Sequence, residues 1–425
     1  MKKLLQLKLR ILAKLILAKY KPEVIGITGS VGKTSTKEAI YTVLSKKFNV
    51  QKNIKNYNNE IGLPLSVIGA ESGGRSLLKW TVVFVKAWSL ILRRDKNYPE
   101  ILILEMGIDR PGDMKYLTDI VKCKIGVVTT IGTVHAEYFE SIDSIQKEKG
   151  ELIKTILQGG WSIINYDDER TRKMTELSKA KVLTYGLDKK AMVRADEINY
   201  SFQNNEINGL SFKLFYNGSV MPVALPNIMS KAAAYSALVG AAVGLAYDMN
   251  LIDIGLALRE MKSPLGRMNL IDGVKGTIII DDTYNAEPKS TAMAIETVKV
   301  IPINDDAKKY AVLGDMLELG QYSEEGHQKI GELVFKSGID YLIAVGERSQ
   351  DIVRGAEAAG MNSDKIFHFD NSSEAGRFIQ DRIETGDLIL VKGSQGMRME
   401  KIVKEIMANP IKAEELLVRQ GEEWE

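Results

Sequence analysis

Residues 24–40 read VIGITGSVGKTSTKEAI, and this stretch decides the fold of the first half of the chain. Its apolar start predicts a buried strand, and KTSTKEAI predicts the helix that follows. The pattern between them, G-x-x-G-K-T, is formed by Gly29, Gly32, Lys33 and Thr34. In such a loop, backbone N–H groups and the helix N-terminus surround phosphates, while the lysine reaches the outer phosphates and the threonine ligates Mg²⁺. The strict pattern has a further glycine where this chain has Ile27, so the loop is a variant.

Composition limits the class of protein. The chain has 425 residues, which suggests two or three domains, and 45% of them are hydrophobic, as in an ordinary globular protein. Its 57 Lys and Arg nearly balance 55 Asp and Glu, so nothing indicates a nucleic-acid partner. A single cysteine, Cys123, excludes a disulfide within the chain and disfavours a cysteine-based zinc site. We expect a cytoplasmic monomer.

Two apolar segments leave membrane association open. Residues 1–21 predict an imperfect amphipathic helix, with Leu and Ile on one broad arc and most Lys and Arg opposite. This helix either packs on the neighbouring domain or binds an anionic membrane as a basic anchor. Residues 77–92 predict a second helix, shorter than the roughly 20 residues that a membrane span requires. We expect a buried helix there, with a membrane-facing hairpin of residues 1–20 and 77–92 as the alternative.

The fold class is predicted to be α/β. Short apolar runs alternate with helical stretches after Glu23, which indicates a parallel sheet covered on both faces, as in P-loop ATPases. We expect a central ATP-binding domain over residues 22–264, with a small antiparallel insert at about 182–225, where short alternating runs are broken by Asn-Gly turns. A fresh series of strands and helices predicts a C-terminal Rossmann-like domain over residues 265–425.

Polar residues at the predicted strand ends are the candidate site, because ligands of such sheets bind at the carboxyl ends of the strands. Glu105 ends the buried strand ILILE, where a carboxylate can hold a metal ion. His135 follows another strand and is equally compatible with a structural role. Lys149 has the sequence context of an ordinary surface lysine on a helix. In the C-terminal half, the strand ends to inspect are DDTYN, GDMLE and KGSQG.

The order of the motifs resembles that of the Mur ligase family over residues 22–405. The first half carries GITGSVGKTSTKE, NYNNEIGLPLSVIG, LEMG, VHAEYF, KGEL and INYDDE. The second half carries LGRMN, IIDDTYNAEPKS, VLGDMLELG and VKGSQGMRME. The DDTYNAEP and LGDMLELG blocks are similar to those of the branch that adds D-Ala-D-Ala to a UDP-MurNAc-peptide.

The resemblance implies a role for each matching position. The ATP-binding set would be Gly29, Ser30, Gly32, Lys33, Thr34, Ser35, Arg267 and Asp282, with Arg267 on the phosphates and Asp282 on the ribose. The Mg²⁺ set would be Thr34, Glu105, His135 and Lys149, with Lys149 carbamylated to hold a second Mg²⁺ ion. Acceptor contacts would come from Asn58, Asn59 and Glu60. The catalytic set would be Lys33, Glu105, His135, Lys149 and Arg267.

The reaction that the resemblance implies joins a carboxylate to an amine through an acyl phosphate, with ATP as the phosphate donor. The acceptor would be a UDP-MurNAc-peptide-like cell-wall precursor, and the amine would come from an amino acid or a dipeptide. Two alternatives remain. One is the same chemistry on another acceptor, either polyglutamate-type or membrane-linked. The other is a non-catalytic nucleotide-binding relative, which the intact Lys33, Thr34, Glu105, His135 and Lys149 disfavour.

Three departures from the family pattern bear on the substrates. Only 23 residues precede the strand of the loop, so we expect no N-terminal domain for the UDP-sugar. Met229, Ser230 and Ala233 replace the residues that usually help to hold adenine. Gln395 stands where an arginine usually follows the KGS run, which weakens the inference about the carboxylate of an incoming dipeptide.

Overall fold

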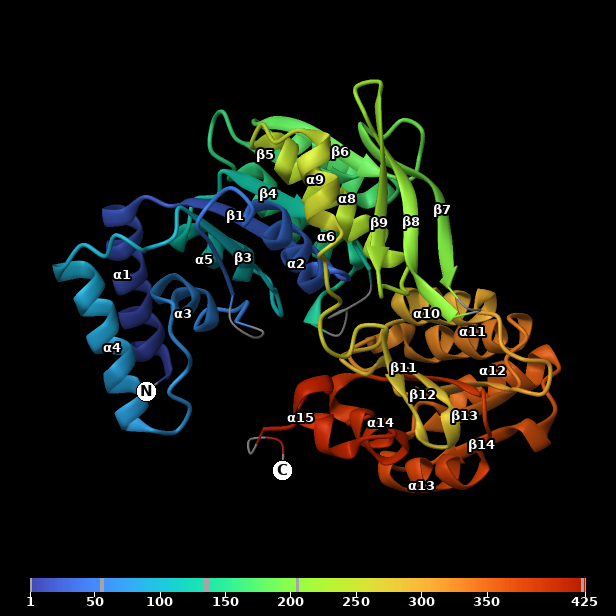
Figure 1. Ribbon diagram of the computed structural model, residues 1–425. Coiled ribbons are helices and arrows are strands. Elements are labelled where there is room, and N and C mark those ends of the chain that lie inside the picture. Colours follow the sequence, from blue (N-terminus) through green and yellow to red (C-terminus); the bar gives the residue numbers. More distant parts are fainter. Residues whose placement is uncertain (1, 54–56, 133–137, 204–205, 422–423, 425) are drawn as a thin grey trace.

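A computed structural model describes residues 2–53, 57–132, 138–203, 206–421 and 424 of the chain. It contains two β-sheets with helices on both faces, which confirms the predicted α/β class (Figure 1).

The first sheet has the strand order β2-β3-β1-β4-β5-β6-β7-β8-β9. Its parallel part consists of β1 (Glu23–Thr28), β2 (Val50–Lys52), β3 (Ile101–Glu105), β4 (Ile125–Val128), β5 (Trp161–Asn165) and β6 (Lys181–Gly186). The central strands β1, β3, β4 and β5 are buried on both faces and therefore read as continuous apolar runs. One face packs against α2 (Lys33–Leu44), α8 (Ala232–Ala246) and α9 (Leu251–Leu258). The other packs against α1 (Lys2–Tyr20), α3 (Gly62–Ile68), α4 (Leu77–Leu92), α5 (Asp113–Ile120) and α6 (Ile142–Lys154).

The antiparallel region extends this sheet. It consists of β7 (Val193–Gln203), β8 (Glu206–Tyr216) and β9 (Ser219–Pro226), which pair in sequence order. The strand β6 pairs in parallel with β5 and with β7, so antiparallel pairing starts with the β7–β8 pair. The short helix α7 (Glu169–Arg172) lies in the connection between β5 and β6.

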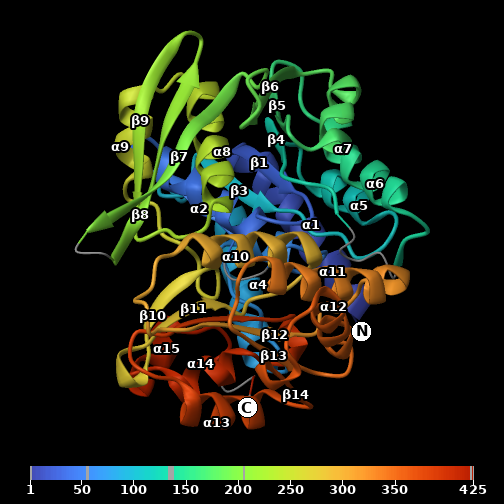
Figure 2. The same cartoon turned by 90° about the vertical axis from the view of Figure 1, so that its right-hand side faces the viewer.

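The second sheet has the order β10-β11-β15-β12-β13-β14. Its strands are β10 (Asn269–Asp272), β11 (Ile278–Asp282), β12 (Lys309–Gly314), β13 (Tyr341–Val345), β14 (Ile366–Phe369) and β15 (Leu388–Lys392). All pairings are parallel except that of β10 with β11. One face packs against α10 (Pro288–Val300), α11 (Ser323–Lys336) and α12 (Gln350–Ala359), and the other against α13 (Ser372–Arg382), α14 (Glu400–Ile406) and α15 (Ala413–Leu416). Figure 2 shows this second unit beneath the first, with α10 between the two sheets.

The two expected apolar helices form, but both differ from the sequence expectation. In α1, Leu9, Leu12 and Ile16 are buried, whereas Leu4, Ile11 and Leu15, which the helical wheel placed on the same broad arc, are exposed. The expectation of a buried helix at residues 77–92 is wrong for one face of α4, because that face is open to solvent. No helix among the described residues is long and apolar enough to cross a membrane.

The C-terminal tail folds back onto the second sheet, although its charged sequence suggests a frayed end. Glu400 is fully buried at the start of α14 and pairs with Arg398 at 2.5 Å and with Arg419 at 2.8 Å. The same Arg419 donates hydrogen bonds to the carbonyl oxygens of Thr283 and Tyr284. The tail therefore supports the loop that follows β11.

We predict that Glu400→Ala lowers the free energy of unfolding by about 3 kcal/mol, because it leaves the buried Arg419 without its carboxylate. Hydrogen exchange of residues 413–421 in the full chain should become faster. Glu405→Ala, an exposed glutamate on the same helix, is the matched control and should change neither quantity. Equal behaviour of the two variants would show that Arg419 does not hold the tail.

Candidate active site

The loop between β1 and α2 is shaped by two glycines. Gly29 has φ +142°, and a β-carbon there would lie 1.9 Å from Thr129 Oγ1 at the end of β4. Gly32 has φ +82° and forms the N-terminal cap of α2. Both conformations favour glycine, and the close approach at Gly29 excludes any larger residue. The loop can therefore lie flat on the strand ends with the N-terminus of α2 directed at a bound phosphate.

Lys33 curls over this loop. Its Nζ donates hydrogen bonds to the carbonyl oxygens of Gly29 at 2.7 Å and Ser30 at 3.3 Å. Desolvation lowers the pKa of Lys33 below its usual value, while the Glu105 carboxylate acts in the opposite direction. The amine is thus held at the place where phosphate oxygens would offer better acceptors than two backbone carbonyls.

Glu105 lies beside the loop at the end of β3, as the sequence predicts for a strand-end carboxylate. Its Oε2 accepts a hydrogen bond from Thr34 Oγ1 at 3.4 Å, and its Oε1 is 3.0 Å from Lys37 Nζ. The Glu105 and Lys37 side chains are almost fully buried, so this ion pair fixes the position of the carboxylate. Lys37 is absent from the predicted site, although it lies one turn before Ile40 on the buried face of α2.

The donor set fits a hard cation. Thr34 and Glu105 offer neighbouring hydroxyl and carboxylate oxygens, the ligand type that Mg²⁺ prefers, and Mg²⁺ usually keeps several waters and substrate phosphate oxygens as its other ligands. Among the described residues, no three His, Cys, Asp or Glu cluster as a complete metal cage. His135 lies outside the described residues.

The structure corrects the sequence interpretation most clearly at Lys149. It is only 2% exposed on α6, whereas its sequence context suggested a surface lysine. Its Nζ donates a hydrogen bond to Ser30 Oγ at 3.3 Å, so Lys149 contacts the phosphate loop from α6. Burial, reinforced by the charge of Lys33, lowers the pKa of Lys149 well below its usual value. A neutral amine is therefore far more accessible here than on a surface lysine.

A carboxylate from the second domain completes this cluster. Glu287, at the start of α10, is 5% exposed, and its Oε2 would lie 3.4 Å from a β-carbon on Gly132. Burial raises the pKa of Glu287, while Lys33 and Lys149 act in the opposite direction. The Oε1 atom has no hydrogen-bond partner among the described residues. Sequence reasoning missed Glu287, because only the packing of α10 against the first domain brings it to the loop.

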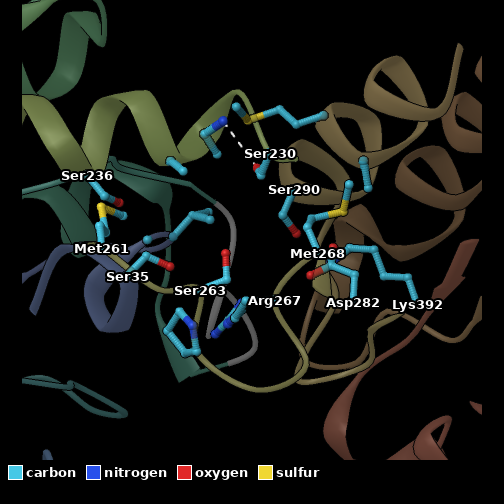
Figure 3. A pocket seen from close by; sticks show the side chains of 17 residues that line it. Ser35, Ser230, Ser236, Met261, Ser263, Arg267, Met268, Asp282, Ser290 and Lys392 are labelled. Atoms are coloured by element: carbon cyan, nitrogen blue, oxygen red, sulfur yellow. Dashed lines mark hydrogen bonds and ion pairs between the residues drawn. The ribbon is translucent and has the colours of Figure 1, made fainter. Parts of the chain in front are cut away.

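Arg267 and Asp282 lie on the opposite wall of the cleft (Figure 3). The Arg267 guanidinium stacks on the Tyr284 ring, with its Cζ 4.2 Å from the ring centroid. Asp282 ends β11 and receives a hydrogen bond of 2.6 Å from Lys392 Nζ, which ends the neighbouring strand β15. Lys392 also donates to the Asn285 carbonyl oxygen at 2.9 Å and thereby ties the β11 loop to β15. Sequence reasoning flagged the KGSQG segment but did not single out Lys392.

A pocket beside the phosphate loop lies between the two domains. Its walls come from α2, α8, the connection before β10 and the second sheet, and small or apolar side chains dominate them (Figure 3). The wall residues include Ser35, Ser230, Ala233 and Asp282. Met229 is buried and does not line this pocket. Ser230 and Ala233, two of the positions that depart from the family pattern, therefore line this pocket, and neither offers a large polar group.

The expected acceptor residues divide into two groups. Asn58 and Asn59 line the cleft with Lys33, Glu105 and Gln395. The side-chain Oδ1 of Asn59 also accepts a hydrogen bond from the Gly62 N–H at 2.9 Å and so fixes the start of α3. Glu60 is not brought to the cleft wall. It accepts from Gln6 on α1 at 2.8 Å.

The site combines a phosphate loop, a strand-end carboxylate, a buried lysine and an arginine from the second domain. One protein family matches the chain that carries it. Residues 27–76 and 85–244 match the model of the Mur ligase middle domain, and residues 266–395 match that of the Mur ligase glutamate ligase domain. The chain belongs to the Mur ligase family and is an ATP-dependent ligase.

Two relatives and two solved structures illustrate the similarity. The UDP-N-acetylmuramoyl-tripeptide–D-alanyl-D-alanine ligase of Bacillus subtilis is 30% identical over 401 residues, which cover 94% of this chain and 79% of the relative. The Escherichia coli enzyme of the same name is 26% identical and is covered to 77%. MurF of Thermotoga maritima in complex with ADP is 27% identical with a TM-score of 0.76, covering 94% of this chain and 83% of that one. MurF of Acinetobacter baumannii has a TM-score of 0.79 at 26% identity, covering 95% and 81%.

Burial of the Lys149 amine predicts a specific pH dependence. Between its lowered pKa and 10.5, the unfolded chain binds a proton that the folded chain does not, so the free energy of unfolding rises with pH. Lys149→Met should remove up to about 1.4 kcal/mol of this rise per pH unit, measured by denaturant unfolding in CO₂-free buffer. Lys147→Met, which changes an exposed lysine of the same helix, should leave the pH profile unchanged. Identical profiles for Lys149→Met and the unmodified chain would show that the buried amine stays protonated.

Proposed function

We propose that this ligase joins the carboxylate of a UDP-MurNAc-peptide to the amine of D-Ala-D-Ala or of a related amino acid or dipeptide. The observation that carries the proposal is the meeting of Lys33, Glu105 and the buried Lys149 at one phosphate loop, closed from the second domain by Glu287. The printed activity of the relatives supplies the substrates.

Two steps complete the reaction. An oxygen of the acceptor carboxylate attacks the γ-phosphorus of ATP, the bond to the β-phosphate oxygen breaks, and ADP leaves. The amine nitrogen then attacks the acyl carbon and loses a proton, and inorganic phosphate leaves with the carboxylate oxygen. Positioning and charge neutralisation dominate such phosphoryl transfers.

Each proposed residue acts by position or charge. Lys33 and Arg267 offset the charge that builds on the transferred phosphoryl group. The Gly29–Ser35 loop holds the phosphates, and Asp282 accepts from the ribose hydroxyls. Asn58 and Asn59 orient the acceptor at the same wall, whereas the location of Glu60 against α1 makes an indirect role the better proposal.

Mg²⁺ would be held by Thr34, Glu105 and His135, with a second ion at a carbamylated Lys149, and it would neutralise phosphate charge. The lowered pKa of Lys149 supports carbamylation, because CO₂ reacts with a neutral amine. In that step the nitrogen bonds to the CO₂ carbon and releases one proton. The product is an anionic carbamate next to Lys33, so a neutral amine is replaced by a negative charge that attracts the Lys33 ammonium.

A membrane-linked acceptor is the second candidate, with the same chemistry. The observation that favours it is the contact between α1 and the acceptor loop, where Gln6 and Lys2 both reach Glu60. The helix α1 lies beside α4, whose outer face is apolar and open to solvent.

We expect ADP release to require both an acceptor and an amine, and Lys33→Ala to slow it at least about 100-fold because the phosphoryl charge loses its partner. A coupled ADP assay with UDP-MurNAc-tripeptide and D-Ala-D-Ala measures this rate. Lys47→Ala, an exposed lysine just beyond α2, should retain full activity. An unchanged rate in Lys33→Ala would remove the assigned phosphate site.

For Lys149, ¹³C NMR of the protein in ¹³C-bicarbonate should show a carbamate signal that Lys149→Ala lacks. That variant should lose activity, and a short carboxylate such as acetate should restore part of it, because a free carboxylate can occupy the vacated space. Full activity of Lys149→Ala without any additive would refute the carbamate role.

A further inference from the structure

We propose that α1 and α4 together form a peripheral binding surface for an anionic lipid bilayer. This lipid-binding surface is defined by Leu4, Leu7, Ile11 and Leu15 of α1 and by Leu77, Leu78, Val82, Val85, Trp88 and Leu92 of α4. Figure 1 shows α4 at the outer edge of the molecule beside α1, on the far side of the first sheet from α9.

The exposed apolar residues follow helical spacing. In α1 they recur every three or four positions, and their side chains are 44% to 57% exposed. In α4 the six side chains are 50% to 82% exposed and cover the whole length of the helix. A monomeric soluble protein rarely leaves large apolar helix faces open to water.

The opposite faces of the two helices are firmly packed. Leu9, Leu12 and Ile16 of α1 and Val83 and Ala87 of α4 belong to one core cluster with the first sheet. Both helices therefore present their outer residues from a fixed platform.

A polar clamp joins the end of α1 to the end of α4. Lys19 Nζ donates to the carbonyl oxygens of Leu90 at 2.8 Å, Ile91 at 2.9 Å and Arg93 at 2.7 Å. These contacts satisfy the final carbonyls of α4 and hold the two helices side by side.

The positive charge of α1 and α4 favours an anionic partner. The two helices carry eight Lys and Arg and no Asp or Glu, although the whole chain has a net charge of only +2. Arg93 and Arg94 follow α4 directly and are exposed. An anionic surface complements this local excess, whereas a second copy of the chain would bring like charges together.

The length of the helices determines how the surface meets a bilayer. Neither helix can cross a membrane, and α4 has only 16 residues. Long basic side chains can extend past the apolar residues to lipid phosphates, and Trp88 suits the interface between acyl chains and headgroups. The geometry fits helices lying in the plane of one leaflet.

The surface is connected to the candidate active site through Glu60, in the loop before α3. Gln6 Nε2 donates to Glu60 Oε1 at 2.8 Å, and Lys2 Nζ lies 3.6 Å from the same atom. Glu60 immediately follows Asn58 and Asn59 on the cleft wall. Lipid binding would therefore bring the acceptor side of the cleft near the membrane, but the proposal stands independently of which acceptor is used.

Vesicle flotation of the full chain tests the proposal. Binding to phosphatidylcholine vesicles containing phosphatidylglycerol should exceed binding to pure phosphatidylcholine vesicles, and raising NaCl from about 0.1 to 0.5 M should weaken it.

The Val82→Gln, Val85→Gln double variant should bind at least about tenfold more weakly, because it removes two inserted apolar side chains. The matched control is Ile252→Gln, Leu256→Gln on α9, whose side chains are similarly exposed, at 63% and 52% against 68% and 63%. This control should bind like the unmodified chain.

Two further measurements test whether lipid occupies the lipid-binding surface. Trp88 fluorescence should shift to shorter wavelength with anionic vesicles, and Trp88→Phe should lose that shift. Circular dichroism and soluble ADP release should be unchanged in the α4 variant, which excludes misfolding as the cause. No binding to anionic vesicles, equal loss in the α9 control, or a dimer in sedimentation that the α4 variant dissociates would overturn the proposal.

Discussion

The convergence of two lysine amines on Ser30, one residue of the phosphate loop, is the constraint on which the site depends. Lys33 Nζ donates to the Ser30 carbonyl oxygen at 3.3 Å, and Lys149 Nζ donates to Ser30 Oγ at 3.3 Å. Among the described residues, neither amine pairs with a carboxylate of its own domain at hydrogen-bond distance. Keeping both amines charged is costly in an empty cleft, because like charges repel and desolvation disfavours both, and the pKa of each lysine is lowered accordingly. It becomes favourable when phosphate oxygens enter. The fold thus maintains a region in which an anionic ligand favours the charged form of both amines.

The second domain supplies the part of the candidate active site that the first domain lacks. The phosphate loop, Glu105 and Lys149 come from the first domain, whereas Glu287, Arg267 and Asp282 come from the second or from its boundary. The Lys392 bridge from β15 to Asp282 and the Arg419 contacts beneath Tyr284 hold the second set in place. A movement between the domains would therefore assemble or separate the two halves of the site and control the access of water to a reactive acyl phosphate.

Sequence patterns predicted the features that depend on local spacing. The glycine loop, the strand ending at Glu105 and the strand ending at Asp282 follow from apolar runs and their polar ends. The burial of Lys149 also left a signal, because it stands four residues after Ile145 and three before Leu152, on the apolar face of α6. Lys392 stands at the start of the KGSQG strand end, although its pairing with Asp282 could not be predicted from spacing, whereas Glu287 left no comparable signal because only tertiary packing brings it to the cleft. The open face of α4 could not be predicted either, because an apolar helix has the same composition whether its partner is protein or lipid.

The central claim is that this cleft activates a carboxylate by phosphorylating it. The most direct measurement uses UDP-MurNAc-tripeptide labelled with ¹⁸O in the acceptor carboxylate, ATP and D-Ala-D-Ala, followed by mass spectrometry of the released phosphate. Transfer of one ¹⁸O atom from the carboxylate to each phosphate is the predicted result, because the acceptor oxygen leaves with the phosphoryl group. Formation of ADP and unlabelled phosphate from the fully labelled acceptor would contradict the account.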